Sequence, residues 1–127
     1  MSTRCQVQII GIDINPDKFT LYHHCDGYPT NMLPLLASAE GDTWQHGRAG
    51  KATAFIMAKD PGGYEPEQGH ELHGDIEYYY QVTVGKGDWT VEAFAVDGWG
   101  EDHKLRSIAG PMSLQEAAKQ AESIEAA

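Results

Sequence analysis

Side chains that can exchange protons or contact a ligand are concentrated in residues 22–29, which read Tyr-His-His-Cys-Asp-Gly-Tyr-Pro. In an extended strand alternate side chains share a face, so His24 is expected beside Asp26 and His23 beside Cys25. A carboxylate two residues from a histidine can orient the imidazole ring and raise its basicity. These residue types suit either a general base with an orienting acid or a set of polar contacts to a ligand.

A second Asp-Gly-aromatic sequence lies at residues 97–99, and Lys104 and Arg106 follow it closely. An aromatic ring beside a cation is what a nucleotide base and its phosphate require. The helix expected after the first element would also favour an anion at its N-terminus. If the strands before the two elements belong to one sheet, both elements lie at sheet ends. We therefore predict one ligand-binding site from both elements, formed by His24, Asp26, Tyr28, Trp99, Lys104 and Arg106.

The same residues permit a purely structural interpretation. Asp26 can bond backbone amides in a turn, Gly27 can adopt a positive φ angle, and Pro29 can fix the entry into a helix. Tyr28 and Trp99 can pack their loops onto the core. The first element would then be a strand-to-helix turn rather than a binding site.

Metal binding and enzyme chemistry are alternatives. His24-x-Asp26 and His70-x-x-His73 could supply four ligands if the loop between them folded back. This spacing matches no standard zinc motif, so we predict no metal and no cofactor. The sequence has no Walker-type glycine loop, no Gly-x-Ser-x-Gly elbow and no paired-carboxylate signature. We therefore predict a non-enzymatic protein, with a metal-dependent or His24–Asp26 enzyme as the alternative.

The two cysteines, Cys5 and Cys25, are predicted on the same face of their strands, which could bring them together across a first hairpin. Two cysteines in a cytosolic chain are more often reduced, and we expect both in the core. A nucleophilic Cys25 would need an activating base. His24 is expected on the opposite face of the strand and His23 on the core face, so neither is well placed.

Hydrophobic periodicity predicts the elements that position these residues. Period-two alternation predicts strands over 5–12, 19–25, 75–84 and 89–96, and two short connections make them two hairpins. Helical spacing predicts helices between Thr30 and Gly41, over 48–59, and after an N-cap at Ser113. The ββααββα order predicts a single α+β domain over 1–127, with one antiparallel sheet of two hairpins and the helices packed on one face.

Charge is unevenly distributed along the 127 residues. The formal net charge is −10, from 19 acidic and 9 basic residues. Residues 60–103 hold eleven acids and one base, Lys86, whereas residues 1–59 and 104–127 each sum to zero. This excess opposes general binding to nucleic-acid phosphates but allows a basic protein partner. The simpler interpretation of this acidic excess is a solvated face that keeps the protein soluble.

The sequence also bears on location and assembly. No stretch approaches the roughly 20 apolar residues of a membrane span, and the N-terminus lacks a signal-peptide pattern. We therefore expect a cytoplasmic protein with no membrane partner. Tyr79 is predicted on the polar face of its strand beside Glu77 and Gln81, which indicates a subunit or partner interface and a homo-oligomer.

The hairpin followed by Tyr-x-His-x-Asp-Gly-Tyr-Pro resembles a group of small phage and prophage proteins, over about the first thirty residues. The resemblance implies a mobile-element accessory protein in the host cytosol, with a counter-defence role. One phage class of similar size is the Thoeris anti-defence sponge, which sequesters a cyclic nucleotide; no ligand-binding residue is transferred from it.

The leading hypothesis is therefore a phage-type protein that binds a nucleotide-like signal or a host defence protein without catalysis. The alternative is an acidic inhibitor of the anti-CRISPR or DNA-mimic type, which would use residues 60–103.

Overall fold

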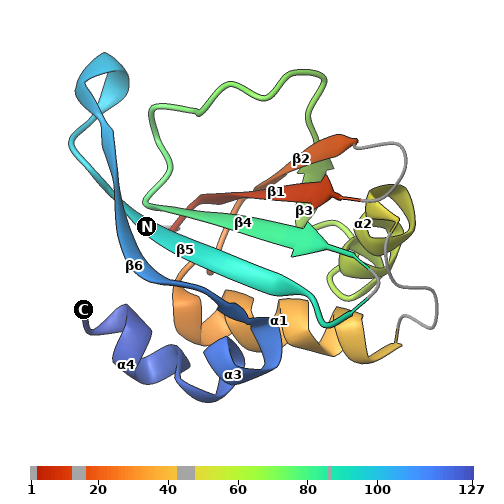
Figure 1. The fold of residues 1–127 in the computed structure, drawn as a ribbon. Helices are drawn as coiled ribbons and strands as arrows, with labels where there is room; N and C mark the ends of the chain where they lie inside the picture. The colour runs from red at the N-terminus through yellow and green to blue at the C-terminus, as the bar shows by residue number, and fades with distance from the viewer. Residues whose placement is uncertain (1–2, 13–16, 43–47, 86) are drawn as a thin grey trace.

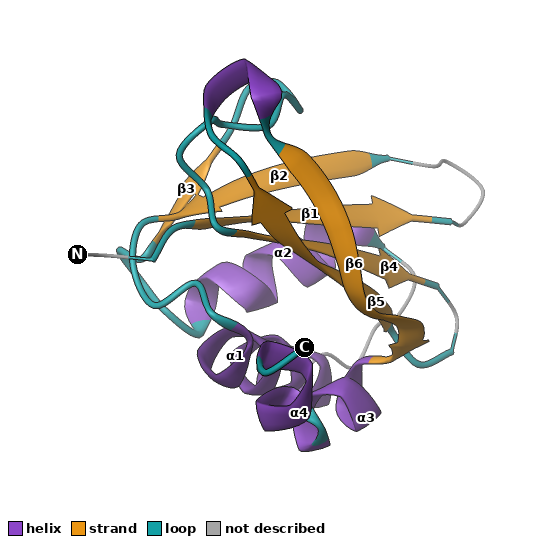
Figure 2. Ribbon diagram, turned by 90° about the vertical axis from the view of Figure 1, so that its left-hand side faces the viewer, coloured by secondary structure: helices purple, strands orange, loops and turns teal. Residues whose placement is uncertain are grey.

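The protein forms a single layer of β-sheet with helices on one side (Figures 1 and 2). The structure, a computed structural model, describes residues 3–12, 17–42, 48–85 and 87–127. Its strands are β1 (Cys5–Gly11), β2 (Lys18–His23), β3 (Tyr64–Pro66), β4 (Tyr78–Val84), β5 (Thr90–Asp97) and β6 (Lys104–Ser113). Its helices are α1 (Pro29–Asp42), α2 (Ala49–Ala58), the short 3-10 helix η1 (Gly100–Asp102), α3 (Leu114–Lys119) and α4 (Ala121–Glu125). The predicted α+β class is confirmed.

The described strands form a six-stranded sheet in the order β3-β2-β1-β4-β5-β6. The pairings within the two predicted hairpins are present, β1 with β2 and β4 with β5, both antiparallel. The two hairpins meet through β1 and β4, which run parallel, so the sheet is mixed rather than antiparallel throughout. A parallel pair needs a long crossover, and the stretch that carries α1 and α2 supplies it. Of the turn that the sequence predicts at residues 15–18, the first two residues lie outside the described residues, and Lys18 is already the first residue of β2.

The glycine and proline content of residues 61–74 predicts a long loop, and residues 98–110 are predicted as another, but each stretch contains strand residues. β3 is a three-residue strand that pairs with β2. β6 is a ten-residue edge strand whose first four residues are exposed, so it lacks the alternation that marks a half-buried strand. The predicted final helix is divided into α3 and α4 at Gln120. The predicted N-cap at Ser113 is confirmed, because the Ser113 hydroxyl accepts a hydrogen bond from the Glu116 N–H at 3.3 Å.

The main core lies between the sheet and the helices. Alternate residues of the strands, among them Val7, Leu21, Tyr80 and Val91, are almost fully buried against α1–α4. Glu40 of α1 is also buried: it accepts a hydrogen bond from the Trp89 N–H at 2.8 Å and another from Gln115 at 3.1 Å. This carboxylate therefore links α1 to β5 and α3 and satisfies a backbone donor that burial would otherwise leave unpaired.

The opposite, outer face of the sheet is crossed by residues 67–77, which we call the strap (Figure 1). The buried Gln6 amide donates to the Glu71 carbonyl at 3.1 Å and accepts from the His73 N–H at 3.0 Å. Beneath the strap lies a second apolar cluster of Tyr22, Ile76 and Tyr79, with Leu72, Phe94 and Val96 packed against it. A segment predicted to be a long loop is thus fastened to the sheet by backbone and side-chain bonds.

The strap changes the interpretation of Tyr79. Its side chain is on the outer face, as predicted, but only 7% of the residue is exposed because it packs in the apolar cluster with Phe94 at a ring-centroid distance of 5.7 Å. Tyr79 therefore has a partner within its own chain, and it offers no support for an oligomer interface.

Within the described part of the chain, no helix is long and apolar enough to cross a membrane.

Candidate functional site

The two Asp-Gly-aromatic elements lie at the same end of the sheet. Cys5 at the start of β1 pairs with His23 at the end of β2 and with Tyr78 at the start of β4, and Tyr78 pairs with Ala95 near the end of β5. The segments that follow β2 and β5 therefore both leave the sheet at this end, as predicted. β1 and β4 intervene, so the two strands are three strand spacings apart, roughly 14 Å.

The first element forms a tight turn into α1. Asp26 has a φ angle of 55°, in the left-handed region that Asp tolerates better than most residues. Its carboxylate accepts a hydrogen bond from the Tyr28 hydroxyl at 3.2 Å, and its carbonyl accepts one from Asn31 at 2.7 Å. The Tyr28 carbonyl accepts from the Met32 N–H at 3.0 Å as the helix begins. The element therefore forms a turn, as the structural interpretation expected, but two of its details are wrong. The positive φ angle is at Asp26 rather than Gly27, and the Asp26 carboxylate accepts from the Tyr28 hydroxyl where backbone amides were expected.

Gly27 is the position in this turn where a side chain would be most crowded. Its N–H donates to the Thr3 carbonyl at 2.9 Å, and its carbonyl accepts from the Tyr80 hydroxyl at 2.7 Å. A Cβ added at Gly27 would lie 2.8 Å from the Cβ of Cys5 and 3.0 Å from the carbonyl carbon of Arg4. The turn is therefore packed directly against the start of β1 and leaves no cleft beneath it.

The N-terminus of α1, where an anion was expected, holds a carboxylate of the chain itself. Glu125 of α4 accepts hydrogen bonds from the Thr30 N–H and the Thr30 hydroxyl. Unpaired N–H groups and the helix dipole favour negative charge at this position. An external phosphate would have to compete with Glu125 for the same donors.

The second element lies at the turn between β5 and β6. Trp99 is 70% exposed, so the expectation that it packs its loop onto the core is wrong. Arg106 donates from its Nε to the Asp97 carboxylate at 3.0 Å, and Lys104 lies opposite Asp97 in the strand register. The aromatic ring and the two cations of the prediction therefore belong to one hairpin, but Trp99 is open to solvent.

The helix-side surface of this hairpin approaches Tyr78. Tyr78, Ala95 and Arg106 are successive register partners across β4, β5 and β6, so they share a face. Partial burial raises the pKa of Tyr78, the negative charges of Glu125 and Glu77 raise it further, and the Arg106 guanidinium opposes them. Tyr28 also has a raised pKa, because it is bonded to Asp26 and feels Glu125. The charge of Glu125 thus contributes to the raised pKa of both tyrosines.

His24 belongs to a different neighbourhood. Its Nε2 lies 2.9 Å from a Glu65 carboxylate oxygen, and its ring packs edge-on to Tyr22 at a centroid distance of 4.7 Å. β2 ends at His23 and the positive φ of Asp26 breaks the alternation, so the predicted His24–Asp26 pair does not form among the described contacts. The predicted six-residue site is therefore divided between three places.

The remaining histidines do not converge on a metal site. His70 Nδ1 is 2.8 Å from the Thr20 hydroxyl, and His73 pairs with Glu67. Among the described residues, no group of three or more His, Cys, Asp or Glu side chains is arranged to hold a metal ion. The histidines instead fasten the strap to β2.

His23 is a buried structural residue. Only 1% of it is exposed, its Nε2 lies 2.6 Å from the Asp60 carboxylate, and its ring packs edge-on against Tyr64 at 4.6 Å. Cys5 lies opposite it in the register and is fully buried, which raises the pKa of its thiol. Both cysteines are free, and Cys25 is exposed, so the expectation that Cys25 lies in the core is wrong. Among the described contacts His23 pairs with Asp60 and His24 with Glu65, so neither of the two candidate bases pairs with Cys25.

The outer face carries an acidic surface that the sequence indicated only as a charge excess. Glu65 is opposite Tyr22 in the register and Glu92 is opposite Gln81, so both are on the outer face. The strap adds further carboxylates. We define the acidic outer face as Glu65, Glu67, Glu71, Asp75 and Glu92. Arg4, 3.7 Å from Asp75, is a cation within this surface.

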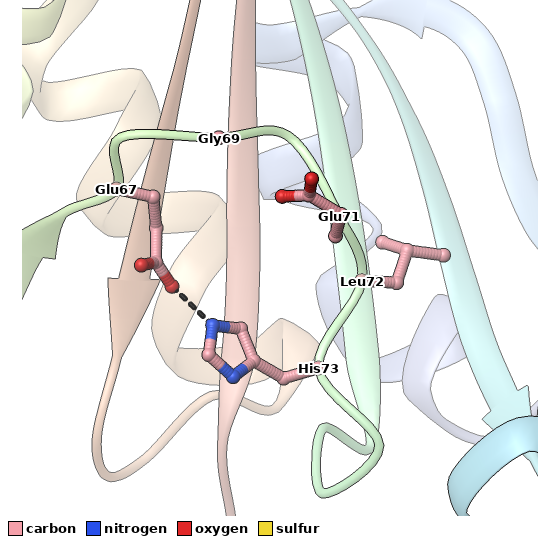
Figure 3. A pocket seen from close by; sticks show the side chains of 5 residues that line it. All are labelled: Glu67, Gly69, Glu71, Leu72 and His73. Carbon is pink, nitrogen blue, oxygen red and sulfur yellow. Dashed lines mark hydrogen bonds and ion pairs between the residues drawn. The ribbon is translucent and has the colours of Figure 1, made fainter.

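A shallow hollow of about 230 Å³ lies within the acidic outer face. It is lined by Glu67, Gly69, Glu71, Leu72 and His73 (Figure 3). Glu67 and His73 point toward one another across it, and Glu71 and Leu72 lie on its other side. The signal that could have located this surface was the set of large aromatic residues on the strand face opposite the main core, Tyr22, Tyr79 and Phe94, which a covering segment would shield from water.

No protein-family model matches the chain, and no curated protein and no solved structure matches it.

Proposed function

We propose that this protein acts by binding rather than by catalysis, and that its acidic outer face contacts a basic surface of a partner protein. The observation that carries the proposal is the gathering of Glu65, Glu67, Glu71, Asp75 and Glu92 on the one sheet face that no helix covers. Complementary charge accelerates association and excludes partners of the wrong sign.

The rigidity of this surface supports the proposal. The strap is bonded to the sheet through Gln6, Thr20 and Tyr22, so its carboxylates are presented on a fixed backbone. A preorganised surface loses less conformational entropy on binding than a mobile loop does. The Glu65 and Asp75 side chains remain 62% and 48% exposed, and are therefore accessible to a partner.

The resemblance to phage and prophage proteins suggests the context. A carboxylate-bearing surface can occupy a site that a defence protein uses for nucleic-acid phosphates, because both present negative charge to Lys and Arg side chains. We therefore propose a counter-defence role in the host cell, with a nucleic-acid-binding defence protein as the partner.

Capture of a nucleotide-like ligand is a second candidate, favoured by one observation. Arg106 and Tyr78 share the helix-side face at the sheet end, and the charge of Glu125 raises the pKa of both Tyr78 and Tyr28. These side chains could contact a phosphate and a base in the way that the sequence predicts. Glu125 at the N-terminus of α1 weakens this candidate, because it already takes the position best suited to a phosphate.

Two matched triple variants test the leading proposal. Glu65→Gln with Glu67→Gln and Glu71→Gln removes three charges from the acidic outer face. Asp42→Asn with Glu116→Gln and Glu122→Gln removes three charges from exposed positions on the helices. The probe is a fluorescein-labelled nona-arginine peptide, and the readout is fluorescence anisotropy at 50 and 300 mM salt.

We expect the outer-face variant to lose about tenfold in affinity at low salt, and the helix variant to lose about threefold or less through the weaker long-range field. Equal losses would contradict a localised binding face. A parallel incubation with cyclic nucleotides, followed by heating and analysis of what is released, tests the second candidate. Release of intact nucleotide by wild type but not by Arg106→Ala would favour it, whereas altered nucleotide would indicate an enzyme.

A further inference from the structure

The turn between β5 and β6 displays a tryptophan that the fold does not use. Trp99 is 70% exposed, more than the other exposed large apolar residues among those described, Ile12, Phe19 and Leu105. It lies between Gly98 and Gly100, whose φ angles of 89° and 60° are in the left-handed region that favours glycine. An exposed tryptophan on a soluble protein is a candidate contact residue, because tryptophan is enriched among the residues that dominate binding energy at interfaces.

The backbone around Trp99 is held in place without help from its side chain. The Asp102 N–H donates to the Trp99 carbonyl at 3.2 Å, and the Gly100 N–H points to the Gly74 carbonyl at 3.4 Å. A Cβ on Gly74 would lie 2.9 Å from the Cα of Gly100, so strap and turn are in close contact. The tip is a constrained turn, and the indole is presented by a fixed backbone.

The contact with the strap places Trp99 at the border of the acidic outer face. Both ribbon views show the β5–β6 turn on the strap side of the sheet, away from the helices (Figures 1 and 2). Asp97, Glu101 and Asp102 flank Trp99 in the turn and are exposed. Two cations, Lys104 and Arg106, share the hairpin with these three carboxylates, and Arg106 is paired with Asp97 while Lys104 lies opposite Asp97 in the register. Arg4, the nearby cation on the strap side, is paired with Asp75. The surroundings of the indole therefore remain predominantly acidic.

We propose that Trp99 is the anchor for an arginine side chain of a basic protein partner, which stacks its guanidinium on the indole while the neighbouring carboxylates accept its N–H groups. This inference rests on the proposed function and names the residue at its centre. An arginine fits better than a lysine, because the planar guanidinium stacks on an aromatic ring and forms forked hydrogen bonds to carboxylates.

Charge selects this partner over the alternatives. A second copy of the chain would bring its own net charge of −10 against the acidic outer face, and would be repelled. Nucleic acid and anionic lipid surfaces are repelled for the same reason. A basic protein surface is the macromolecular partner whose charge complements both the indole face and its carboxylate neighbours.

The test compares nona-arginine with nona-lysine, both fluorescein-labelled, by anisotropy at 50 mM salt. The variants are Trp99→Ala, Trp99→Phe and Phe19→Ala, the last a matched loss of an exposed aromatic residue from β2. Thermal melts followed by circular dichroism check each variant, and we expect Trp99→Ala to melt as wild type does because its side chain is unpacked.

We expect wild type to prefer nona-arginine, and Trp99→Ala to lower nona-arginine affinity about three- to fivefold and to abolish the preference. Trp99→Phe should retain part of the preference for nona-arginine, and Phe19→Ala should retain all of it. If Trp99→Ala binds nona-arginine as wild type does while the outer-face triple variant loses affinity, Trp99 is not the anchor and the proposed function stands. If the outer-face triple variant also binds as wild type does, the proposed function itself fails.

Discussion

Thr30 and Glu125 are bonded across the helical layer: one carboxylate oxygen accepts the Thr30 N–H at 3.0 Å and the Thr30 hydroxyl at 2.8 Å. Thr30 is in the first turn of α1 and Glu125 is the last residue of α4, 95 positions later. The end of the described chain thus supplies the N-terminal capping group of the first helix. α1 has no acidic residue in its own first turn, so the Glu125 carboxylate supplies the negative charge that the positive end of the helix dipole favours.

Removing this carboxylate should destabilise the fold. We expect Glu125→Ala to lower the free energy of unfolding by about 1–2 kcal/mol, because a helix loses its cap and two donors lose their acceptor. Urea denaturation followed by circular dichroism measures the change. Glu122→Ala, an exposed position one turn earlier in α4, should change it by less than about 0.5 kcal/mol, and equal effects of the two variants would refute the capping role.

Gly27→Ala should be more damaging, because the added Cβ meets the backbone of Arg4 and the side chain of Cys5 rather than open space. We expect a loss of about 1–3 kcal/mol from overpacking. Tyr80→Phe, which removes the hydroxyl bonded to the Gly27 carbonyl, should cost about 1 kcal/mol. The control is Gly41→Ala, where nothing lies within 4 Å of the new Cβ and the helix should gain up to about 1 kcal/mol. Thermal melts should give melting temperatures that rise in the order Gly27→Ala, Tyr80→Phe, Gly41→Ala.

Asp26 should influence the titration of Tyr28 more than the stability of the fold. The hydrogen bond from Tyr28 to the Asp26 carboxylate, and the charge of that carboxylate, raise the pKa of Tyr28 above its ordinary value. Asp26→Asn should lower the pKa of Tyr28 toward that value while tolerating the positive φ, and Asp26→Ala should cost about 1 kcal/mol in addition. NMR titration of isotope-labelled tyrosine measures the pKa. An unchanged Tyr28 titration in Asp26→Asn would show that this bond is absent in solution.

Alkaline pH should destabilise the protein through Tyr22. Burial, followed by the hydrogen bond to Asp75, raises the pKa of Tyr22 to about 12 from its usual value near 10. Because the folded state prefers the protonated phenol, this contribution is fully present below pH 10 and is lost as the pH rises from about 10 to 12. Urea denaturation between pH 8.5 and 11.5 should give a shallower fall for Tyr22→Phe than for wild type. Parallel curves would contradict the assignment.

Gln6→Ala should release the strap without unfolding the sheet. The variant removes both side-chain bonds that hold the backbone of Glu71 and His73. We expect faster amide hydrogen exchange over residues 70–76, measured by mass spectrometry, with protection of β1, β4 and β5 retained. Gln81→Ala, which removes a bond to Gln8 on the same face, serves as the control and should leave strap exchange unchanged.

The sequence identifies the elements in which residue types alternate from one face to the other. β1, β2, β4 and β5 each bury one face against the helices, so their period-two pattern is readable, and α1 and α2 were predicted within two residues at each end. β6 was missed because Lys104, Leu105 and Arg106 are all exposed at the sheet edge, and exposure leaves no alternation. The parallel pairing of β1 and β4 depends on a long crossover, which local patterns do not encode.

The candidate site was predictable in part for the same reason. Strand ends can be placed from the pattern, so the two Asp-Gly-aromatic elements were correctly expected at sheet ends. The distance between the two elements depends on the order of the strands in the sheet. Because β1 and β4 lie between β2 and β5, Tyr28 is kept apart from the hairpin that carries Trp99. The pairing of His24 with Glu65 joins residues 41 positions apart, beyond the reach of local spacing.

The central position of β1 governs how the chain can fold during synthesis. Its side chains pair with β4 across 73 positions, as in the bond between Gln81 and Gln8. Until β4 has been synthesised, the edge of β1 that β4 will cover stays open, although α1 and α2 precede β4 in the chain. Closure of that edge is a long-range event, and such contacts slow folding and extend exposure to aggregation.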